Sequence, residues 1–428
     1  MKCLITSEQI RDAIKKHRTE LPRYQKLYNY YVGRNDILNR QLPDPLKPNN
    51  KIATSYPSLI IDTVVGYFAS KPVSYLSRSN NEKYLADLQK IFLLNDEEDC
   101  NAEIVKDFSI FGKCYELTYI DTQGNIRFQQ YSPLEMYVEK DSQDNILFGL
   151  RYWQEKQGDT NVTKVEAYDA EGFHYFTSFD GGETFVLDQS IPHYFGEVPV
   201  TIYKNNDEEI GDFEKQIPLI DAIDKILSDS ANELESFANA YLLIKGYQGT
   251  KPEDIEKMRQ NGVLLLDNQG DASWLIKNIN NQFQQNFFET IDNLIHIQTA
   301  TPKLTTEQFS SNLSGIAIGF KLFGLESKCS VKERKMEKAL RKRIRLITNI
   351  LNLKGANYNY TDIQFQFSRN IPQNEMEIVQ EIVQLTNMVD LETRLSWHPR
   401  IQNPKQVIEK LKQEQDTMNL DAIGDSNE

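Results

Sequence analysis

Several signatures of catalysis, cofactor binding and membrane insertion are missing from this 428-residue chain. It has no GxxxxGK[ST] phosphate loop and no HExxH, paired CxxC, GxSxG or GxGxxG motif. No apolar run approaches the roughly 20 residues that a membrane-spanning helix needs. The first residues also lack the apolar core of a signal peptide. We therefore expect a protein that is not an enzyme, that uses no cofactor and that has no membrane partner.

Cysteine and histidine are scarce, and neither forms a metal-binding pattern. The five histidines are scattered along the chain, and no DxD-type acidic cluster follows a strong strand. The spacing of the cysteines predicts reduced, mostly buried thiols rather than disulfides or metal ligands. These cysteines are Cys3, Cys100, Cys114 and Cys329. No metal site is expected.

Positive charge is also in deficit, because 62 acidic residues outnumber 48 lysines and arginines and leave a net charge of −14. Stable DNA binding needs phosphate neutralisation by basic residues, so the balance argues against wrapping DNA by bulk charge. It remains compatible with a surface past which DNA slides. An apolar content of 39% with 26% charged residues fits a globular protein with room for two or three domains.

One segment, residues 314–353, reverses this charge balance. Its apolar residues recur at three- and four-residue steps, which is one face of an α-helix; they are Met336, Leu340, Ile344, Ile347 and Leu351. Its other faces carry Lys332, Arg334, Lys335, Lys338, Arg341, Lys342, Arg343 and Arg345. A solvated helix face is the simplest interpretation of such a run. A DNA-binding adaptor that grips nucleic acid with residues 332–345 is the alternative.

Hydrophobic periodicity divides the first half of the chain into helices followed by strands. We expect a helix over residues 6–32 with Ser7 as its N-cap, and a buried helix over 59–68. A helical pair is expected over 81–112, broken at Asn95 and Gly112. From Cys114 to Tyr203 the period becomes two, with turn signals between short segments, which predicts an antiparallel meander.

The second half alternates long helices with short strands. A helical seam with acidic flanks covers residues 217–244, and a second helix covers 283–300. Between them lie two strand-like pieces, 262–267 and 272–276. Pro302 ends the second helix. The basic helix follows, then one strand over 361–368 and a helical tail from about residue 370 that is broken at 396–399.

Short motifs in this order resemble those of the portal proteins of tailed bacteriophages, of the type found in long-tailed phages of Gram-positive hosts. None is specific alone, but the ordered set spans about residues 25–415. The motifs are YYVG at 30–33, PNNKI at 48–52, IDTVVGYF at 61–68, KPVSY at 71–75, IPLIDA at 217–222, SDSANELE at 228–235, SGIA at 314–317 and FSRNIP at 367–372.

The resemblance implies an α+β portal-protein fold with a mainly helical wing, stem and crown, an antiparallel β meander in the wing and a small strand-bearing clip. It implies a ring at one capsid vertex that serves as the channel for DNA packaging and ejection. The implied regions are the wing at 1–215, stem helix 1 at 216–245, the clip at 246–282, stem helix 2 at 283–300, the tunnel loop at 301–313, the long helix at 314–357, a strand returning to the wing at 358–373, and the crown and tail at 374–428.

The same resemblance implies partners and candidate site residues. The expected partners are further copies of the chain in a dodecamer, the terminase large subunit, a head–tail connector, the major capsid and scaffolding proteins, and double-stranded DNA. The expected location is the virion, after assembly in the bacterial cytoplasm. Implied tunnel-lining residues are Lys303, Thr305, Glu307, Gln308, Asp224, Glu233 and Glu235. Implied clip contacts with the motor or connector are Lys251, Glu253, Lys257, Arg259, Asp267 and Trp274.

Overall fold

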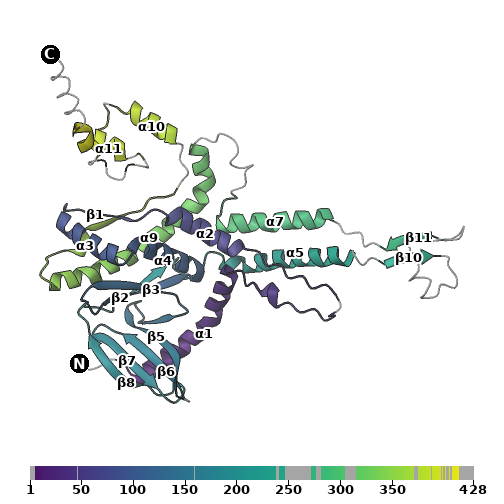
Figure 1. Cartoon of the computed structure of the whole chain (residues 1–428), viewed down its shortest axis with the longest axis horizontal. Helices are drawn as coiled ribbons and strands as arrows, with labels where there is room; N and C mark the ends of the chain where they lie inside the picture. The colour runs from purple at the N-terminus through teal and green to yellow at the C-terminus, as the bar shows by residue number, and fades with distance from the viewer. Residues whose placement is uncertain are drawn as a thin grey trace, which may run out of the picture. The chain divides into compact units, whose positions relative to one another are not determined.

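Figure 1 shows the computed structural model of the whole chain. The chain divides into two compact units. One unit comprises Met1–Lys303 and Gly324–Arg369, and the other comprises Leu304–Phe323 and Asn370–Glu428. Helices occur together with antiparallel sheets, which confirms the expected α+β class. The structure describes residues 5–45, 47–158, 160–237, 241–245, 271–275, 281–303, 315–370, 375–386, 388–396, 398, 401, 404 and 407–413.

Helix α1 (Ser7–Tyr31) begins with a capping box. The Thr6 hydroxyl accepts a hydrogen bond from the backbone N–H of Gln9 at 3.2 Å. The Gln9 side chain accepts one from the backbone N–H of Thr6 at 2.8 Å. The helix was predicted, but its cap was not: Thr6 takes that role instead of Ser7, because only Thr6 has a glutamine three residues later that closes the box.

Three further helices precede the sheets: α2 (Tyr56–Phe68), α3 (Glu82–Leu94) and α4 (Glu97–Phe111). The last two are the predicted helical pair, and Asn95 and Gly112, where breaks were expected, are their C-cap residues. Gly112 has a φ of 89°, and a Cβ at this position would lie 2.0 Å from the backbone oxygen of Glu209. Glycine is therefore required where α4 approaches that loop.

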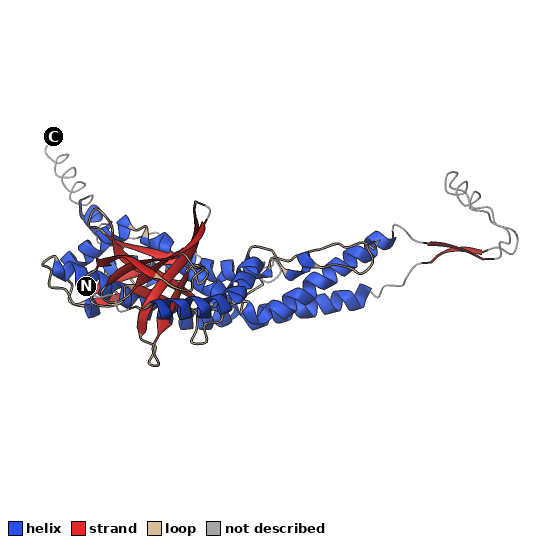
Figure 2. Ribbon diagram, turned by 90° about the horizontal axis from the view of Figure 1, so that it is seen from below, coloured by secondary structure: helices blue, strands red, loops and turns tan. Residues whose placement is uncertain are grey.

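The strands between residues 113 and 204 form two antiparallel sheets (Figure 2). The strand orders are β3-β2-β9 and β4-β5-β6-β7-β8. Antiparallel strands were predicted, but the single meander was not correct, because β9 returns to pair with β2. The strands are β2 (Lys113–Ile120), β3 (Ile126–Tyr131), β4 (Met136–Lys140), β5 (Ile146–Gln157), β6 (Thr160–Tyr168), β7 (Gly172–Ser178), β8 (Val186–Pro192) and β9 (Val200–Lys204).

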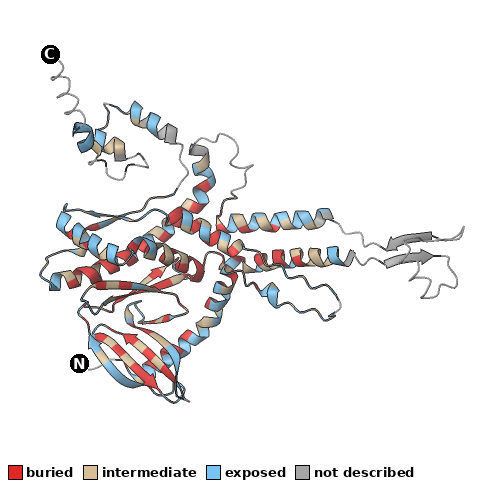
Figure 3. Cartoon of the chain, in the orientation of Figure 1, coloured by how far each residue is buried: buried red, intermediate tan, exposed pale blue. Residues whose placement is uncertain are grey.

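Helix α1 covers one face of the larger sheet. Ile10 and Ile14 of the helix pack in one buried cluster with Phe148 and Val165 of the strands. Burial alternates along several strands, as β4 and most of β7 show, because successive side chains point to opposite faces (Figure 3). The apolar face of the sheet therefore forms a core with α1.

Helix α9 (Gly315–Leu353) matches the helical segment predicted at 314–353 within one residue, and it ends before residue 357, the end implied by the resemblance. One face of its C-terminal half is buried, where Ile344 and Ile347 share a cluster with Tyr84 and Leu88 of α3. Strand β12 (Ile363–Gln366) is the predicted strand in a shorter form, and it pairs antiparallel with β1 (Ser74–Ser77). The sequence had not indicated β1, a four-residue strand at the end of the segment after α2.

The segment between the sheets and α9 is a helix, a strand pair and a second helix: α5 (Ile217–Phe237), β10 (Tyr241–Lys245), β11 (Asp271–Leu275) and α7 (Asn281–Thr299). The first helix is shorter than predicted, since residues 241–245 form a strand. Strand β11 confirms the predicted piece at 272–276, but its partner is β10. The predicted strand at 262–267 lies outside the described residues.

The tail contains the helices α10 (Glu375–Gln384) and α11 (Leu391–Ser396). This confirms a helical tail with a break at residue 396. Short 3-10 helices occur at Asp36–Asn39, Glu214–Gln216 and Tyr360–Asp362.

Candidate functional surfaces and the charges that support them

Helices α5 and α7 form an antiparallel pair (Figures 1 and 2). At one end of the pair, Gln216 Nε2 donates to Gln298 Oε1 at 3.5 Å. At the other end, Gln284 Nε2 donates to Glu233 Oε2 at 3.2 Å. The pair is rooted in the core of its unit by the buried residues Ile220, Ile223, Ile291 and Ile295.

The half of this pair nearer β10 and β11 is not buried by the chain itself (Figure 3). From residue 229 to 235 and from 284 to 290, every described side chain is intermediate or exposed. In this half Leu234 is 70% exposed and Phe287 is 45% exposed, and Leu294 and Ile297 are exposed nearer the other end of α7. Apolar side chains left uncovered in this way are typical of a surface that another protein covers.

The segment between α1 and α2 folds over the acidic side of α5. Asp224 is completely buried there. Its Oδ1 accepts from the backbone N–H of Thr54 at 2.8 Å, and its Oδ2 accepts from Asn35 Nδ2 at 2.6 Å. Further bonds join Tyr30 to Asp221, Arg40 to Asp229 and Asn50 to Glu235.

The predicted tunnel-lining role is therefore wrong for Asp224, because a carboxylate enclosed by its own chain cannot face a passing ligand. Glu233 and Glu235 stand at the outer end of α5, where Glu233 is intermediate and Glu235 is exposed. Their tunnel-lining role stays a prediction.

Lys303, the candidate DNA contact, is tied back to α7. Its ammonium group forms an ion pair with Asp292 and donates to Asn293 Oδ1 at 2.6 Å. Tyr56 also donates to Asp292, at 2.6 Å. Burial alone would raise the pKa of Asp292, but hydrogen bonds from Lys303 and Tyr56 hold it below its ordinary value. Lys303 is thus positioned by a carboxylate rather than free to move.

Most of the other predicted site residues lie outside the described residues. In the segment after Lys303 these are Thr305, Glu307 and Gln308. In the predicted clip they are Lys251, Glu253, Lys257, Arg259 and Asp267. Trp274 belongs to β11 and stands opposite Leu242 in the β10–β11 ladder.

Arg343 of α9 is fully buried in a network of acidic and amide groups. Its Nε donates to Glu116 Oε2 at 2.9 Å, and its Nη1 donates to Asn101 Oδ1 at 2.8 Å and lies 3.2 Å from Glu97 Oε1. Glu97 also accepts a hydrogen bond from the Tyr75 hydroxyl. Burial disfavours the cation, yet Glu116 raises the pKa of Arg343 well above its ordinary value. The arginine therefore joins α9 to α4 and β2.

Lys332 is the second buried cation of α9. Its Nζ lies 2.8 Å from Asp212 Oδ2 and donates to Ser109 Oγ at 2.9 Å. Burial lowers the pKa of Lys332 to about 8. Burial alone would raise the pKa of Asp212, but Lys328 and Lys332 hold it at about 2. The pair links α9 to the loop before α5.

These contacts use most of the positive charge that suggested DNA binding. Further ion pairs join Lys335 to Asp207, Arg341 to Glu337, and Lys342 and Arg345 to Glu197. Within residues 332–345, Arg334 and Lys338 are the cations to which the described part of the chain supplies no carboxylate within 4.0 Å. The basic helix is mainly an internal structural element.

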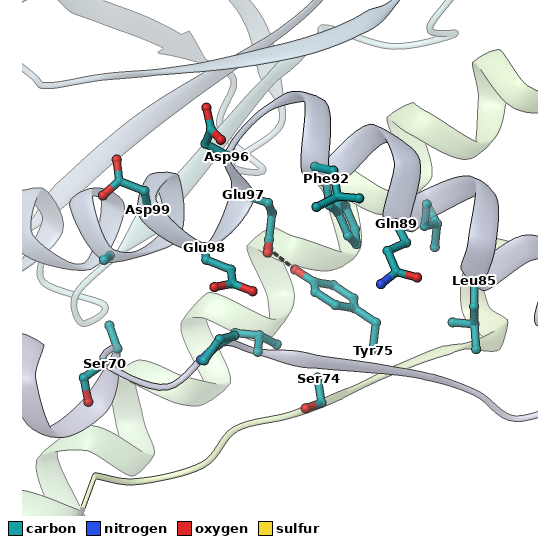
Figure 4. A pocket seen from close by; sticks show the side chains of 16 residues that line it. Ser70, Ser74, Tyr75, Leu85, Gln89, Phe92, Asp96, Glu97, Glu98 and Asp99 are labelled. Carbon is teal, nitrogen blue, oxygen red and sulfur yellow. Dashed lines mark hydrogen bonds between the residues drawn. The ribbon is translucent and has the colours of Figure 1, made fainter. Parts of the chain in front are cut away.

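A groove of about 960 Å³ lies between the segment before β1, helix α3 and the start of α4 (Figure 4). Tyr75 and Phe92 pack against each other there, with ring centroids 4.6 Å apart. Asp96, Glu98 and Asp99 also line the groove and are exposed. The groove therefore combines aromatic surface with carboxylates.

Sequence reasoning missed the buried network and the groove. A signal for the network was available, because Arg343 is seven residues after Met336 and so falls on the apolar face of α9. A cation at such a position is buried and needs partners. Nothing in the local pattern indicated the groove, whose lining comes from three separate segments.

Neither a metal site nor a membrane span is found in the described part of the chain. Its histidines, cysteines and carboxylates form no group of three or more that could hold a metal ion. No described helix has the length and apolar character needed to cross a bilayer. Cys114 and Cys329 are buried as expected, and Cys100 is partly buried.

Comparisons with known proteins give one consistent result. The model of the family described as "Phage portal protein, SPP1 Gp6-like" matches residues 10–419. The portal protein of Bacillus phage SPP1 is 25% identical over 418 residues, which cover 90% of this chain and 82% of the relative. The portal protein of Clostridium phage phiCD119 is 21% identical over 453 residues, which cover 98% of each chain.

Proposed function

From the premise that this chain belongs to the family of SPP1 Gp6-like phage portal proteins, we propose that it assembles into a dodecameric ring whose tunnel is built around the α5–α7 pair. The family has a structural role, as the portal through which phage DNA is packaged and ejected. Membership implies a homo-oligomeric ring, capsid and packaging partners, and a place in the virion.

One observation supports the proposed use of α5 and α7 most strongly. The pair is anchored in a core at one end, but at the other end it leaves Leu234 and Phe287 uncovered. Such a pair cannot bury both of its flanks within one chain. Neighbouring copies in a ring would cover them, while Glu233 and Glu235 would present negative charge that repels phosphate and lets DNA slide.

The remaining regions follow the same assignment. The stem consists of α5 and α7, and the first stem helix ends at Phe237. The clip is the strand-bearing segment between them, and residues 304–313 are the rest of the tunnel loop. The wing comprises the N-terminal helices and the sheets, to which β12 returns, and the crown begins near α10.

The proposed partners are assigned to these regions. The clip would contact the terminase large subunit during packaging and the head–tail connector afterwards. Capsid and scaffolding proteins would contact the wing, and assembly would take place in the host cytoplasm. Lys303 would touch the DNA backbone only weakly, because Asp292 already shares its charge.

Electron microscopy of the purified full-length chain tests the proposal. We expect rings with an axial channel, with about twelve subunits and with α5 and α7 beside the channel. A ring with α7 on its outer rim would contradict the assignment, and a chain that stays monomeric across salt and protein concentration would contradict ring formation.

The DNA-binding adaptor has less support. Lys332 and Arg343 of its basic helix are buried inside the protein, and the family match assigns the chain to portal proteins instead.

A further inference from the structure

The groove beside α4 carries negative charge that the chain does not neutralise. Asp96, Glu98 and Asp99 line it, and none has a basic partner within 4.0 Å among the described residues. Acidic residues in the first turn of α4 are favoured by the helix dipole. The dipole does not account for the hollow beside them, which is walled by apolar and aromatic side chains (Figure 4).

The groove walls suit the stem of a long basic side chain. Tyr75 and Phe92 provide aromatic surface, and Leu93 is 74% exposed at the edge. Lysine and arginine pack their methylene stems on apolar surface and keep the charge at a polar rim. Glu97 is not available to such a guest, because Arg343 and Tyr75 already occupy it.

A matching positive stripe lies on α9. Arg334, Lys338 and Arg341 are exposed and follow each other at steps of four and three residues, so they share one face. Arg341 is paired with Glu337, whereas Arg334 and Lys338 have no acidic partner within 4.0 Å among the described residues. Two cations of the stripe, Arg334 and Lys338, are therefore available to pair with carboxylates of another subunit.

The stripe and the groove face different ways. Met336 of α9 lines a small pocket together with Glu98 and Pro72, and both of these residues also line the groove. A helix turns about 100° per residue, so Arg334 and Lys338 project about 160° away from Met336. The stripe thus lies on the side of α9 turned away from the groove, and one subunit cannot join its own two surfaces.

We propose that the acidic groove of one subunit receives the Arg334–Lys338 stripe of the next subunit in the ring. A ring requires a heterologous contact, in which two different surfaces of the same chain are complementary and face different directions. The groove and the stripe meet both conditions. This proposal rests on the proposed ring and names the residues that hold neighbouring copies together in its wing.

Paired charge reversals test the contact in the full-length chain. A groove variant carries Glu98→Lys and Asp99→Lys, and a stripe variant carries Arg334→Glu and Lys338→Glu. In each variant alone, like charges meet at every contact, so the concentration needed for half-assembly should rise about tenfold or more. Mass photometry at low salt measures the ring fraction, and circular dichroism verifies that each variant is folded.

Mixing the two variants gives the sharpest result. A groove variant and a stripe variant are complementary at both contacts, so an equimolar mixture should recover rings in which they alternate. A control with Glu155→Lys and Glu183→Lys makes the same charge change at exposed sites of the larger sheet region. This control should assemble like the wild type.

The outcomes separate this contact from ring formation itself. If wild-type rings form and either reversal leaves them unchanged, the contact is overturned while the portal assignment stands. It is also overturned if both reversals prevent assembly but their mixture does not recover rings. A wild-type chain that forms no ring under any condition would overturn the proposed function together with the contact.

Discussion

At the scale of single residues, the buried cations of α9 join this helix to α4, to β2 and to the loop before α5. A buried ion pair adds little stability compared with an apolar contact, but removing one partner leaves an uncompensated charge. Arg343 faces Glu97 and Glu116, so it is the residue whose loss exposes two carboxylates to this penalty.

Replacing Arg343 with methionine should therefore destabilise the chain by about 3–5 kcal/mol. Arg341→Met on the exposed side of the same helix is the matched control, and it should stay within about 0.5 kcal/mol of the wild type. Denaturant unfolding of the unassembled subunit measures both. Equal losses in the two variants would show that the buried network does not have the assigned role.

The buried Asp107 of α4 should make the unfolding free energy fall as the pH rises, which is the opposite of the usual effect of an aspartate. Burial raises its pKa from 3.8 to about 7. Between about pH 4 and pH 7 the folded chain keeps a proton that the unfolded chain has released. The contribution of this residue is therefore a stabilisation at low pH that is lost as the pH rises through 7.

The variant Asp107→Asn has a side chain that stays uncharged at every pH. Its amide oxygen can still accept the hydrogen bond from Gln130. We expect it to exceed the wild type in unfolding free energy by roughly 2–4 kcal/mol at pH 8, with the difference vanishing near pH 4. Unfolding curves of both proteins across this range are the measurement. A difference that is constant with pH would argue against a raised pKa.

At the scale of elements, the β10–β11 ladder is the described structure between α5 and α7. Its register, with Tyr241 opposite Leu275 and Lys245 opposite Asp271, depends on backbone pairing. Proline lacks a backbone N–H and fixes φ, so it is poorly tolerated inside such a ladder. The core that roots the two helices, including Ile223 and Ile291, lies elsewhere in the sequence.

Leu243→Pro should consequently disrupt this strand pair while leaving ring formation intact. If the clip is the docking end, binding of the packaging motor to preformed rings should fall at least about tenfold. Leu243→Ala serves as the control, because it keeps the backbone N–H. Rings that fail to form while the remaining subunit still binds the motor would assign the segment to assembly instead.

At the scale of the whole molecule, the net charge of −14 and the internal use of basic residues predict weak DNA binding. If all eight cations between residues 332 and 345 contacted phosphates, log K would fall with log salt at a slope of about −7. The two cations without an acidic partner, Arg334 and Lys338, allow a slope of only about −2.

Binding of a short DNA duplex to the isolated subunit, measured by fluorescence anisotropy from about 50 to 200 mM salt, distinguishes these values. We expect a shallow slope and low affinity. A steep slope would favour the DNA-binding adaptor. If the slope then became shallow in Arg334→Glu, the stripe on α9 would be identified as the surface that contacts DNA.

Much of this fold was determined by the sequence on its own. Apolar steps of three and four residues from Met336 to Leu351 located the C-terminal part of α9, and the change to a period of two after Cys114 located the sheets. Both signals are local, because they record which face of a single element is buried. The ordered motifs also indicated the family, and the family match over residues 10–419 confirms it.

Only the tertiary structure decided which distant groups meet. Asp224 was expected to face a tunnel, yet Thr54 and Asn35 enclose it. Likewise, β12 pairs with β1, which lies far before it in the sequence, and Arg343 pairs with Glu97 and Glu116. Periodicity shows that a side chain is buried or exposed, but its partner depends on how remote segments pack, and no local pattern contains that information.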